Sequence, residues 1–211
     1  NKDLPVSDMP VPDMPEVSVV AHTDKAKALH TIVAAFAADP LTRWVVPQAD
    51  SYLTYGVRIF DAFGGAAFAA GTAYEVSGFA GAALWVPPGH EDEAADEAAE
   101  EAFGQILVEI VAPERLDEVT RVLSEMQSYH PVDPCWYLPL IGVDPCHQGQ
   151  GFGAKLMKYA LAQCDAQGLP AYLESSNPAN ITLYERHGFE LMGRIQSASS
   201  PPVHPMYRAA R

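Results

Sequence analysis

Apolar positions along the first third of the chain predict a short strand followed by two helices. Residues 17–21 favour a strand, and residues 26–36 carry apolar side chains at helical spacing until Asp39-Pro40 ends the pattern. A second helical pattern runs from about residue 52 to residue 69. It contains Gly64-Gly65, and a glycine inside a helix costs about 1 kcal/mol relative to alanine. We therefore expect the far end of this helix to be broken or mobile.

The middle of the chain predicts a hairpin and two more helices. Residues 72–76 and 79–86 have the character of paired strands around a turn at Ser77-Gly78. Residues 90–101 are dominated by Asp and Glu, after which apolar residues return at helical spacing, and residues 116–126 form another helical pattern. The acidic run fits a solvated helix face, and an alternative is that its charges help to attract a cationic amine.

The last third begins with an apolar strand. Residues 136–143 carry no charge, as expected for a strand that is covered on both faces. Pro139 lies inside this strand, and since proline cannot donate a ladder hydrogen bond, we expect strand pairing to be interrupted there. A helix over residues 155–167 and a strand over residues 169–175 follow, with Gly168 in the position of a helix C-cap.

The C-terminal residues predict one more helix and two strands. The helix spans about 179–187, which places Asn180 and Tyr184 four residues apart on one side of it. Residues 189–196 and 203–208 are the expected strands. The expected helices and strands together are compatible with an α/β fold class.

Composition is typical of one globular domain over residues 17–211. Of the 211 residues, 48% are hydrophobic and 19% are charged, so the chain can bury a core. Residues 1–16 are rich in proline and acidic residues, which is typical of a disordered leader or a remnant of cloning. Cys135, Cys146 and Cys164 are odd in number and widely spaced, which indicates reduced thiols. With no signal peptide and no apolar run of about 18 residues, we expect a cytoplasmic protein.

The net charge narrows the range of partners. A formal charge of −14 at pH 7 disfavours nucleic acids and anionic membranes, whose phosphates require clustered Lys and Arg. It is compatible with a cationic small molecule. The sequence leaves open whether the protein is a monomer or a homodimer.

The segment with the clearest chemistry is the loop between the apolar strand and the next helix. Gly149, Gly151 and Gly153 allow positive φ and let a ligand touch the main chain. The following helix directs its unpaired N–H groups and the positive end of its dipole at the loop, which predicts a phosphate site. A P-loop would require Gly-Lys-Ser/Thr, and a dinucleotide fingerprint would require Gly-x-Gly-x-x-Gly. The loop matches neither.

The loop does contain Gln-x-x-Gly-x-Gly, formed by Gln148, Gly151 and Gly153, and there it resembles the pyrophosphate loop of the GCN5-related N-acetyltransferases (GNAT). Residues 173–189 look like that family's second cofactor segment, and residues 136–189 are similar to the puromycin N-acetyltransferases within the superfamily. The resemblance implies a GNAT fold, with a mixed central sheet of about seven strands whose fourth and fifth strands are splayed. It also implies acetyl-CoA as the acyl donor.

The resemblance assigns residues to that donor. The main chain of Ile141, Gly142 and Val143 would pair with the pantetheine arm of coenzyme A between the splayed strands. The other expected cofactor-binding residues are Gln148, Gly149, Gln150, Gly151, Phe152, Gly153, Ala154, Asn180 and Tyr184. An ordinary N-cap or a surface amide is an equal alternative for Asn180.

Acetyl transfer to an amine requires a base and an acid. An alkylamine with a pKa of about 10.4 arrives protonated, and Glu174 is the candidate base, acting directly or through water. The Tyr184 hydroxyl is the candidate acid for the departing thiolate. The structural alternatives are that Glu174 binds nearby amides and that Tyr184 is a core aromatic residue. The predicted reaction is direct transfer of an acetyl group to a primary amine of a small molecule.

Other residues support rival hypotheses. Cys146 beside His147 could form a nucleophile with its base, although adjacent residues tend to point apart. The histidines show no metal-binding spacing, so no metal is expected. Trp85 and Trp136 could line an acceptor pocket or belong to the core. The alternative functions are acetylation of a protein lysine or N-terminus, and a non-catalytic sensor that binds acyl-CoA.

Overall fold

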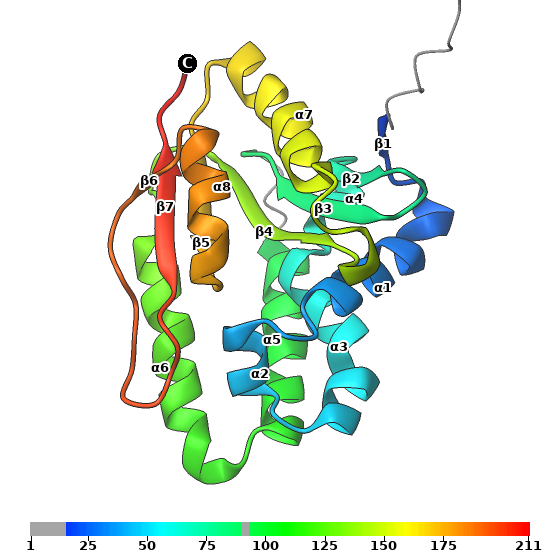
Figure 1. The fold of residues 1–211 in the computed structure, drawn as a ribbon. Coiled ribbons are helices and arrows are strands. Elements are labelled where there is room, and N and C mark those ends of the chain that lie inside the picture. The colour runs from blue at the N-terminus through cyan, green and yellow to red at the C-terminus, as the bar shows by residue number, and fades with distance from the viewer. Residues whose placement is uncertain (1–15, 90–92) are drawn as a thin grey trace, which may run out of the picture.

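The computed structural model describes residues 16–89 and 93–211, which fold around a seven-stranded sheet (Figure 1). The strand order is β1-β2-β3-β4-β5-β7-β6. The strands are β1 (Val17–Val19), β2 (Ala73–Val76), β3 (Gly81–Val86), β4 (Trp136–Val143), β5 (Ala171–Ser175), β6 (Glu190–Leu191) and β7 (His204–Arg208). Among the described strands, β4 and β5 form the one parallel pair. The expected α/β fold with a mixed sheet is confirmed, while residues 1–15 of the predicted leader at 1–16 and residues 90–92 of the acidic run lie outside the described residues.

Helices cover both faces of the sheet (Figure 1). The α-helices of the described chain are α1 (Lys25–Ala35), α2 (Pro40–Val45), α3 (Ala49–Gly64), α4 (Ala66–Ala69), α5 (Glu93–Ile110), α6 (Pro113–Tyr129), α7 (Phe152–Gln167) and α8 (Ile181–Arg186). The helix α7 packs on one face, and α1 and α3 pack on the other. Within the described ranges, no helix has the length and hydropathy needed to cross a membrane.

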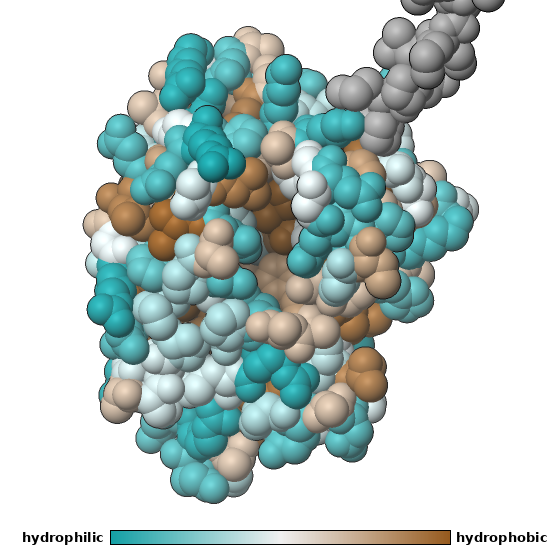
Figure 2. Space-filling view, in the orientation of Figure 1, coloured by the Kyte–Doolittle hydropathy of each residue, from teal (hydrophilic) through white to brown (hydrophobic). Residues whose placement is uncertain are grey.

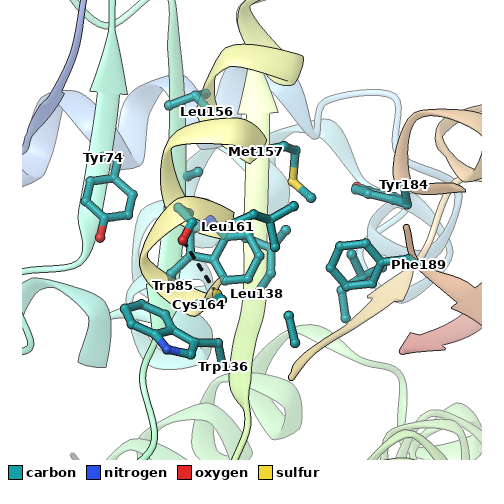
Figure 3. Close-up of a cluster of buried hydrophobic side chains, with 14 of the residues drawn as sticks. Tyr74, Trp85, Trp136, Leu138, Leu156, Met157, Leu161, Cys164, Tyr184 and Phe189 are labelled. Atoms are coloured by element: carbon teal, nitrogen blue, oxygen red, sulfur yellow. Dashed lines mark hydrogen bonds between the residues drawn. The ribbon is translucent and has the colours of Figure 1, made fainter. Parts of the chain in front are cut away.

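The core under α7 contains both tryptophans that could have lined a pocket (Figure 3). Trp85 and Trp136 are buried, and their ring centroids lie 6.5 Å apart in an edge-to-face arrangement. Cys164 is buried in the same cluster and donates its thiol to the Ala160 carbonyl at 3.5 Å. These three side chains therefore stabilise the fold, as the core alternative predicted.

A β-bulge interrupts β4 at the predicted place. Between Tyr137 and Leu140, β4 advances three residues while the paired β3 advances two. The additional residue falls beside Pro139, which cannot donate to the ladder. Because a bulge reverses the alternation of side chains, Leu138 packs under α7 whereas Leu140 packs with α1 and α3.

The strands β4 and β5 separate just beyond this bulge. They pair only where residues 136–138 of β4 face residues 171–173 of β5. From there β4 continues along β3 to Val143, and β5 continues along β7 to Ser175. A V-shaped opening, here called the V, therefore lies between the C-terminal halves of β4 and β5, as expected for splayed strands.

One helix boundary agrees with the prediction and another differs from it. The long second helix does break at its glycines, because α3 ends at Gly64 and a Cβ on Gly65 would lie 2.3 Å from the Asp61 carbonyl oxygen. Asp39, however, begins a helix instead of only ending one. Its side chain accepts a hydrogen bond of 2.9 Å from the Thr42 N–H and so caps α2, in which Pro40 occupies the first turn.

The C-terminal elements are shorter than predicted. A 3-10 turn, η3 (Pro178–Asn180), precedes α8, so the predicted single helix over 179–187 is two elements. Asn180 is exposed at the N-cap position of α8, whereas Tyr184 is buried within that helix. The predicted strand over 189–196 is reduced to β6 and an isolated bridge between Ile195 and Val203.

Candidate active site

The glycine-rich loop leads directly into an uncapped helix N-terminus. A 3-10 turn, η2 (Pro145–His147), follows β4, and the Asp144 side chain accepts a hydrogen bond of 2.8 Å from the Cys146 N–H. Gly149 and Gly151 then adopt left-handed conformations, with φ of 77° and 80°. Gly151 is the N-cap of α7, and no side chain caps this helix. The first N–H groups of α7 therefore remain available to an anion, next to the positive end of the helix dipole.

The third glycine of the motif has a different environment. Gly153 lies inside the first turn of α7, and a Cβ there would meet Leu183 Cδ2 at 3.6 Å and Val143 Cγ2 at 3.9 Å. Both distances are ordinary van der Waals contacts. Neither backbone strain nor a clash with protein atoms explains this glycine.

The V exposes main-chain groups on the side of β4. The Asp144 N–H donates to the Ala80 carbonyl at 2.9 Å. This bond identifies which residue pairs of the β3–β4 ladder are hydrogen-bonded. Because paired groups alternate in an antiparallel ladder, those of Gly142 face β3, and those of Ile141 and Val143 face the V. Figure 2 shows a hollow with apolar walls at the middle of the face where Figure 1 places this separation.

Contacts made by Gly142 and by Gln148 shape the β4 edge of the V. A Cβ on Gly142 would lie 2.4 Å from the Ala35 Cβ, so only glycine allows α1 to pack this closely on β4. Gln148 donates its side-chain amide to the Val143 carbonyl at 3.3 Å. The glutamine of the motif thus ties the loop to the strand that precedes it.

Glu174 lies near the end of α6, on the face of β5 that points away from α7. Its Oε1 is 3.4 Å from Nε2 of His130, the C-cap residue of α6. The imidazole meets the rings of Tyr137 and Tyr172 edge to face, with centroid distances of 4.3 and 4.7 Å. The Glu174 side chain is 4% exposed and that of His130 is 27% exposed. We call these four residues the Glu174 cluster.

The tyrosines of the Glu174 cluster are held in their neutral form. Burial raises the pKa of Tyr137 and that of Tyr172, and the negative charge of Glu174 raises both further. The Tyr172 hydroxyl lies near Glu174 without reaching hydrogen-bond geometry and is otherwise buried without a partner within the described residues. Cys135 lies close by, and burial followed by the charge of Glu174 raises its pKa to about 11. The two tyrosines and the cysteine near Glu174 therefore remain protonated at neutral pH.

Tyr184 lies on the α7 side of the sheet, close to a second buried carboxylate. Its ring packs against Phe189 with a centroid distance of 6.3 Å (Figure 3). Burial raises the pKa of Tyr184, and the charge of Asp39 raises it further. Asp39 accepts a hydrogen bond of 2.6 Å from the Ser176 hydroxyl, which links the N-terminus of α2 to the turn after β5. The Tyr184 hydroxyl consequently stays protonated.

Comparison of the sequence with known families identifies the family of this chain. The profile of the acetyltransferase (GNAT) family matches residues 61–189. That range is more than half of the chain and contains the glycine-rich loop, the V and the Glu174 cluster. The chain belongs to the GNAT acetyltransferase family. Enzymes of this family use acetyl-CoA as the donor of the acetyl group.

Individual GNAT proteins resemble the chain over most of its length. An uncharacterised N-acetyltransferase of Schizosaccharomyces pombe is 29% identical over 174 residues, which cover 79% of this chain and 70% of the relative. A Corynebacterium glutamicum structure, described as histone acetyltransferase HPA2 and related acetyltransferase, has a TM-score of 0.65 at 24% identity and covers 93% of this chain and 97% of its own. The polyamine N-acetyltransferase of Drosophila melanogaster has a TM-score of 0.58 at 20% identity, covering 93% and 100%. At such identities the structural likeness establishes the GNAT fold.

The rival sites do not assemble in this GNAT domain. The His147 imidazole is directed at Asp144, with 4.0 Å between Nδ1 and Oδ1, and Cys146 is exposed beside it. In the part of the chain that the structure describes, no three His, Cys, Asp or Glu side chains gather as a metal site would require. Glu174 and Tyr184 come from opposite faces of the sheet, and among the described residues no hydrogen bond joins them.

Sequence reasoning missed His130, Tyr137, Asp39 and Ser176. His130 follows the last turn of α6 and precedes a proline, so local rules describe it only as a helix end. For Asp39 the sequence did contain a usable pattern. Asp before Pro commonly begins a helix as well as ending one, so it could have predicted the N-cap of α2. Nothing in the local sequence around His130 or Tyr137 indicates a carboxylate partner on another strand.

Proposed function

We propose that this GNAT enzyme transfers the acetyl group of acetyl-CoA directly to a primary amine of a small molecule. One observation carries the proposal: an uncapped helix N-terminus with two left-handed glycines opens beside the V. A diphosphate fits the first feature, and an extended amide-containing chain fits the second. In this proposal residues 17–211 act as one catalytic domain.

The loop supplies donors that suit a diphosphate. N–H groups at the start of α7, from Phe152, Gly153 and Ala154, would bind phosphate oxygens with help from the helix dipole. Gly149 and Gly151 would let the main chain approach the ligand, and their left-handed conformations are already formed. Gln148 and Gln150 lie exposed in the same loop and would border the site.

The V supplies partners for the pantetheine arm. Main-chain groups of Ile141 and Val143 face the opening, so they would pair with its amides as a neighbouring strand does. Gly142 would contribute through its small size, because its main-chain groups face β3. Asn180 is exposed at the start of α8 and would reach the cofactor from the opposite wall. The acyl group would then lie between the two strands.

Glu174 would remove the proton from the amine. The amine must be neutral to attack, and an alkylammonium with a pKa of about 10.4 does not lose its proton unaided at pH 7. Glu174 is held among neutral tyrosines at the end of β5, where the V opens. The proton would pass to a carboxylate oxygen, directly or through a water molecule.

Tyr184 would protonate the departing thiolate. Its raised pKa keeps the hydroxyl in the donor form throughout the neutral range, so the acid is ready without a change in pH. It lies in α8, in the cluster beneath α7, on the opposite face of the sheet from Glu174. Base and acid would therefore act from opposite sides of the acyl group.

The proposal of a small cationic acceptor has two supports. The net charge of −14 favours the approach of an amine and disfavours polyanions. The Drosophila structure is described as a polyamine N-acetyltransferase that forms N-acetylagmatine, so the same fold serves small amines in at least that protein.

A panel of primary amines tests the proposed function. Purified protein, acetyl-CoA and each amine are incubated, and release of free thiol is followed together with the mass of the product. We expect one class of small amines to accelerate thiol release and to gain the mass of one acetyl group. Acceleration by peptides alone would replace the acceptor proposed here, and acetyl-CoA binding without acceleration by any amine or peptide would favour the sensor.

Two variants test the assigned roles once an acceptor is known. Glu174→Gln and Tyr184→Phe remove a proton-transfer group with little change of shape. General acid or base catalysis contributes roughly 10²- to 10⁴-fold, so we expect kcat to fall within that range while the KM for acetyl-CoA changes little. Wild-type turnover in either variant would refute the role of that residue.

A further inference from the structure

We propose that His130 is a positioning and proton-relay residue that accepts the amine proton from Glu174 and passes it to solvent. The inference rests on the proposed function of Glu174 as base and goes beyond it by assigning the route on which the proton leaves. It starts from one contact, the 3.4 Å between His130 Nε2 and Glu174 Oε1.

Burial makes such a route necessary. The Glu174 side chain is 4% exposed, so a proton that it has accepted has little direct access to water. The adjacent His130 side chain is 27% exposed and bridges from the carboxylate to the surface. Glu174 has to be ionised again before the next amine reacts, and the imidazole is the neighbour through which it can lose its proton.

The chemistry of the two groups gives the transfer its direction. A neutral imidazole is a stronger base than a carboxylate, so a proton moves favourably from a carboxylic acid to an imidazole beside it. Glu174 becomes a carboxylate again, His130 becomes an imidazolium, and the imidazolium releases the proton to water. No oxidant, reductant or additional group is required. Contacts of this kind are commonly long in ligand-free enzymes and shorten when substrate binds.

The surroundings of His130 orient its ring. Tyr137 of β4 and Tyr172 of β5 hold the imidazole edge to face, at centroid distances of 4.3 and 4.7 Å. The titratable groups around this pair are Glu174, Tyr137, Tyr172, Cys135 and Tyr129. Among these groups, only Glu174 carries a carboxyl group. The ring is thus fixed with Nε2 directed at that carboxylate.

Replacement of His130 by asparagine or glutamine tests the relay. Both variants retain a polar side chain but cannot carry a proton at neutral pH. At low buffer concentration we expect kcat to fall about 10- to 100-fold, within the range for loss of a proton-transfer group. We expect added imidazole to restore a large part of kcat to the variants and to leave the wild type unchanged. A purely structural role would give no such rescue.

Matched measurements separate the relay from loss of fold and from failure of the proposed function. His22→Asn changes an exposed histidine far along the chain, in η1 (His22–Asp24), and should keep wild-type kcat. Thermal unfolding and coenzyme A affinity of the His130 variants should match the wild type. Tyr137→Phe should preserve the ring that packs on His130 and should show no rescue by imidazole.

Each outcome has one meaning. Loss of turnover in Glu174→Gln, with wild-type kcat and no buffer dependence in both His130 variants, overturns the relay and leaves the function of Glu174 intact. Loss of turnover in the His130 variants alone, with an active Glu174→Gln, would make His130 the base and would also overturn the relay. Should the wild type acetylate no amine at all, the proposed function fails first and the relay fails with it. Loss in both positions, with rescue by imidazole only at His130, supports the relay.

Discussion

Replacement of Gly151 by alanine measures how much the preformed loop contributes to donor binding. Gly151 has a φ of 80°, and a Cβ there would meet no atom within 4 Å. The penalty is therefore conformational and not steric, and an L-residue in the left-handed region costs about 1–2 kcal/mol. Because the loop is exposed, it can relax in the free protein, and coenzyme A must then restore the left-handed geometry. This cost corresponds to a loss of affinity of about 5- to 30-fold.

The assay is isothermal titration calorimetry of coenzyme A with the purified protein at one fixed ionic strength. Gly168→Ala is the matched control, because Gly168 caps the other end of α7 with a φ of 62° and also has open space around it. We expect Gly168→Ala to carry a similar conformational cost, which should lower the melting temperature. The affinity for coenzyme A should stay unchanged.

Two results would contradict this reasoning. If Gly151→Ala bound coenzyme A as tightly as the wild type, the left-handed conformation would not be part of the donor site. If Gly168→Ala lost as much affinity as Gly151→Ala, the effect would come from general destabilisation of α7 and not from the loop.

Two further predictions concern stability. Gly142→Ala would place a Cβ 2.4 Å from the Ala35 Cβ, and such overpacking should lower the free energy of unfolding, measured by urea denaturation, by about 1–3 kcal/mol. Gly104→Ala is the control: this glycine lies inside α5 with nothing within 4 Å of its Cβ position, so alanine should raise the free energy of unfolding by up to about 1 kcal/mol. Equal effects at the two glycines would refute the close approach of α1 to β4. Asp165 forms a double contact with the buried Arg208 guanidinium, at 2.8 and 2.9 Å, and hydrogen bonding to that group lowers the pKa of the carboxyl. Since the folded pKa is depressed, this stabilisation is complete above the ordinary pKa of about 3.9 and is lost as pH falls through the lower folded value. The melting temperature of Asp165→Asn should therefore lie below that of the wild type at pH 7, and the difference should shrink in acid; a difference that is constant with pH would show that the ionised carboxyl is not the cause.

The sequence alone determined the features that depend on neighbouring residues. Pro139 predicted the interruption of β4 because it lacks an N–H, and a bulge is found beside it. Gly168 predicted the end of α7 because it adopts the left-handed conformation without strain, and its φ is 62°. The glycine-rich loop and the uncapped start of α7 were predicted for the same reason, since turn and cap preferences act over a few residues.

The tertiary structure alone decided which distant groups meet. His130 lies beside Glu174 because the end of α6 packs against β4 and β5, and no periodicity along the chain records which helix end reaches which strand. Asp39 contacts Ser176 because α2 lies over the turn after β5, and the local Asp-Pro pair indicates only a helix boundary.

 The physical reason is the range of the forces. Helix caps, turns and side-chain alternation are set by neighbouring residues and can be read from the sequence, whereas contacts between distant segments form only when the sheet and its helices pack together. The loop and helix start that form the proposed donor site were therefore predictable, and the surroundings of the proposed base were not.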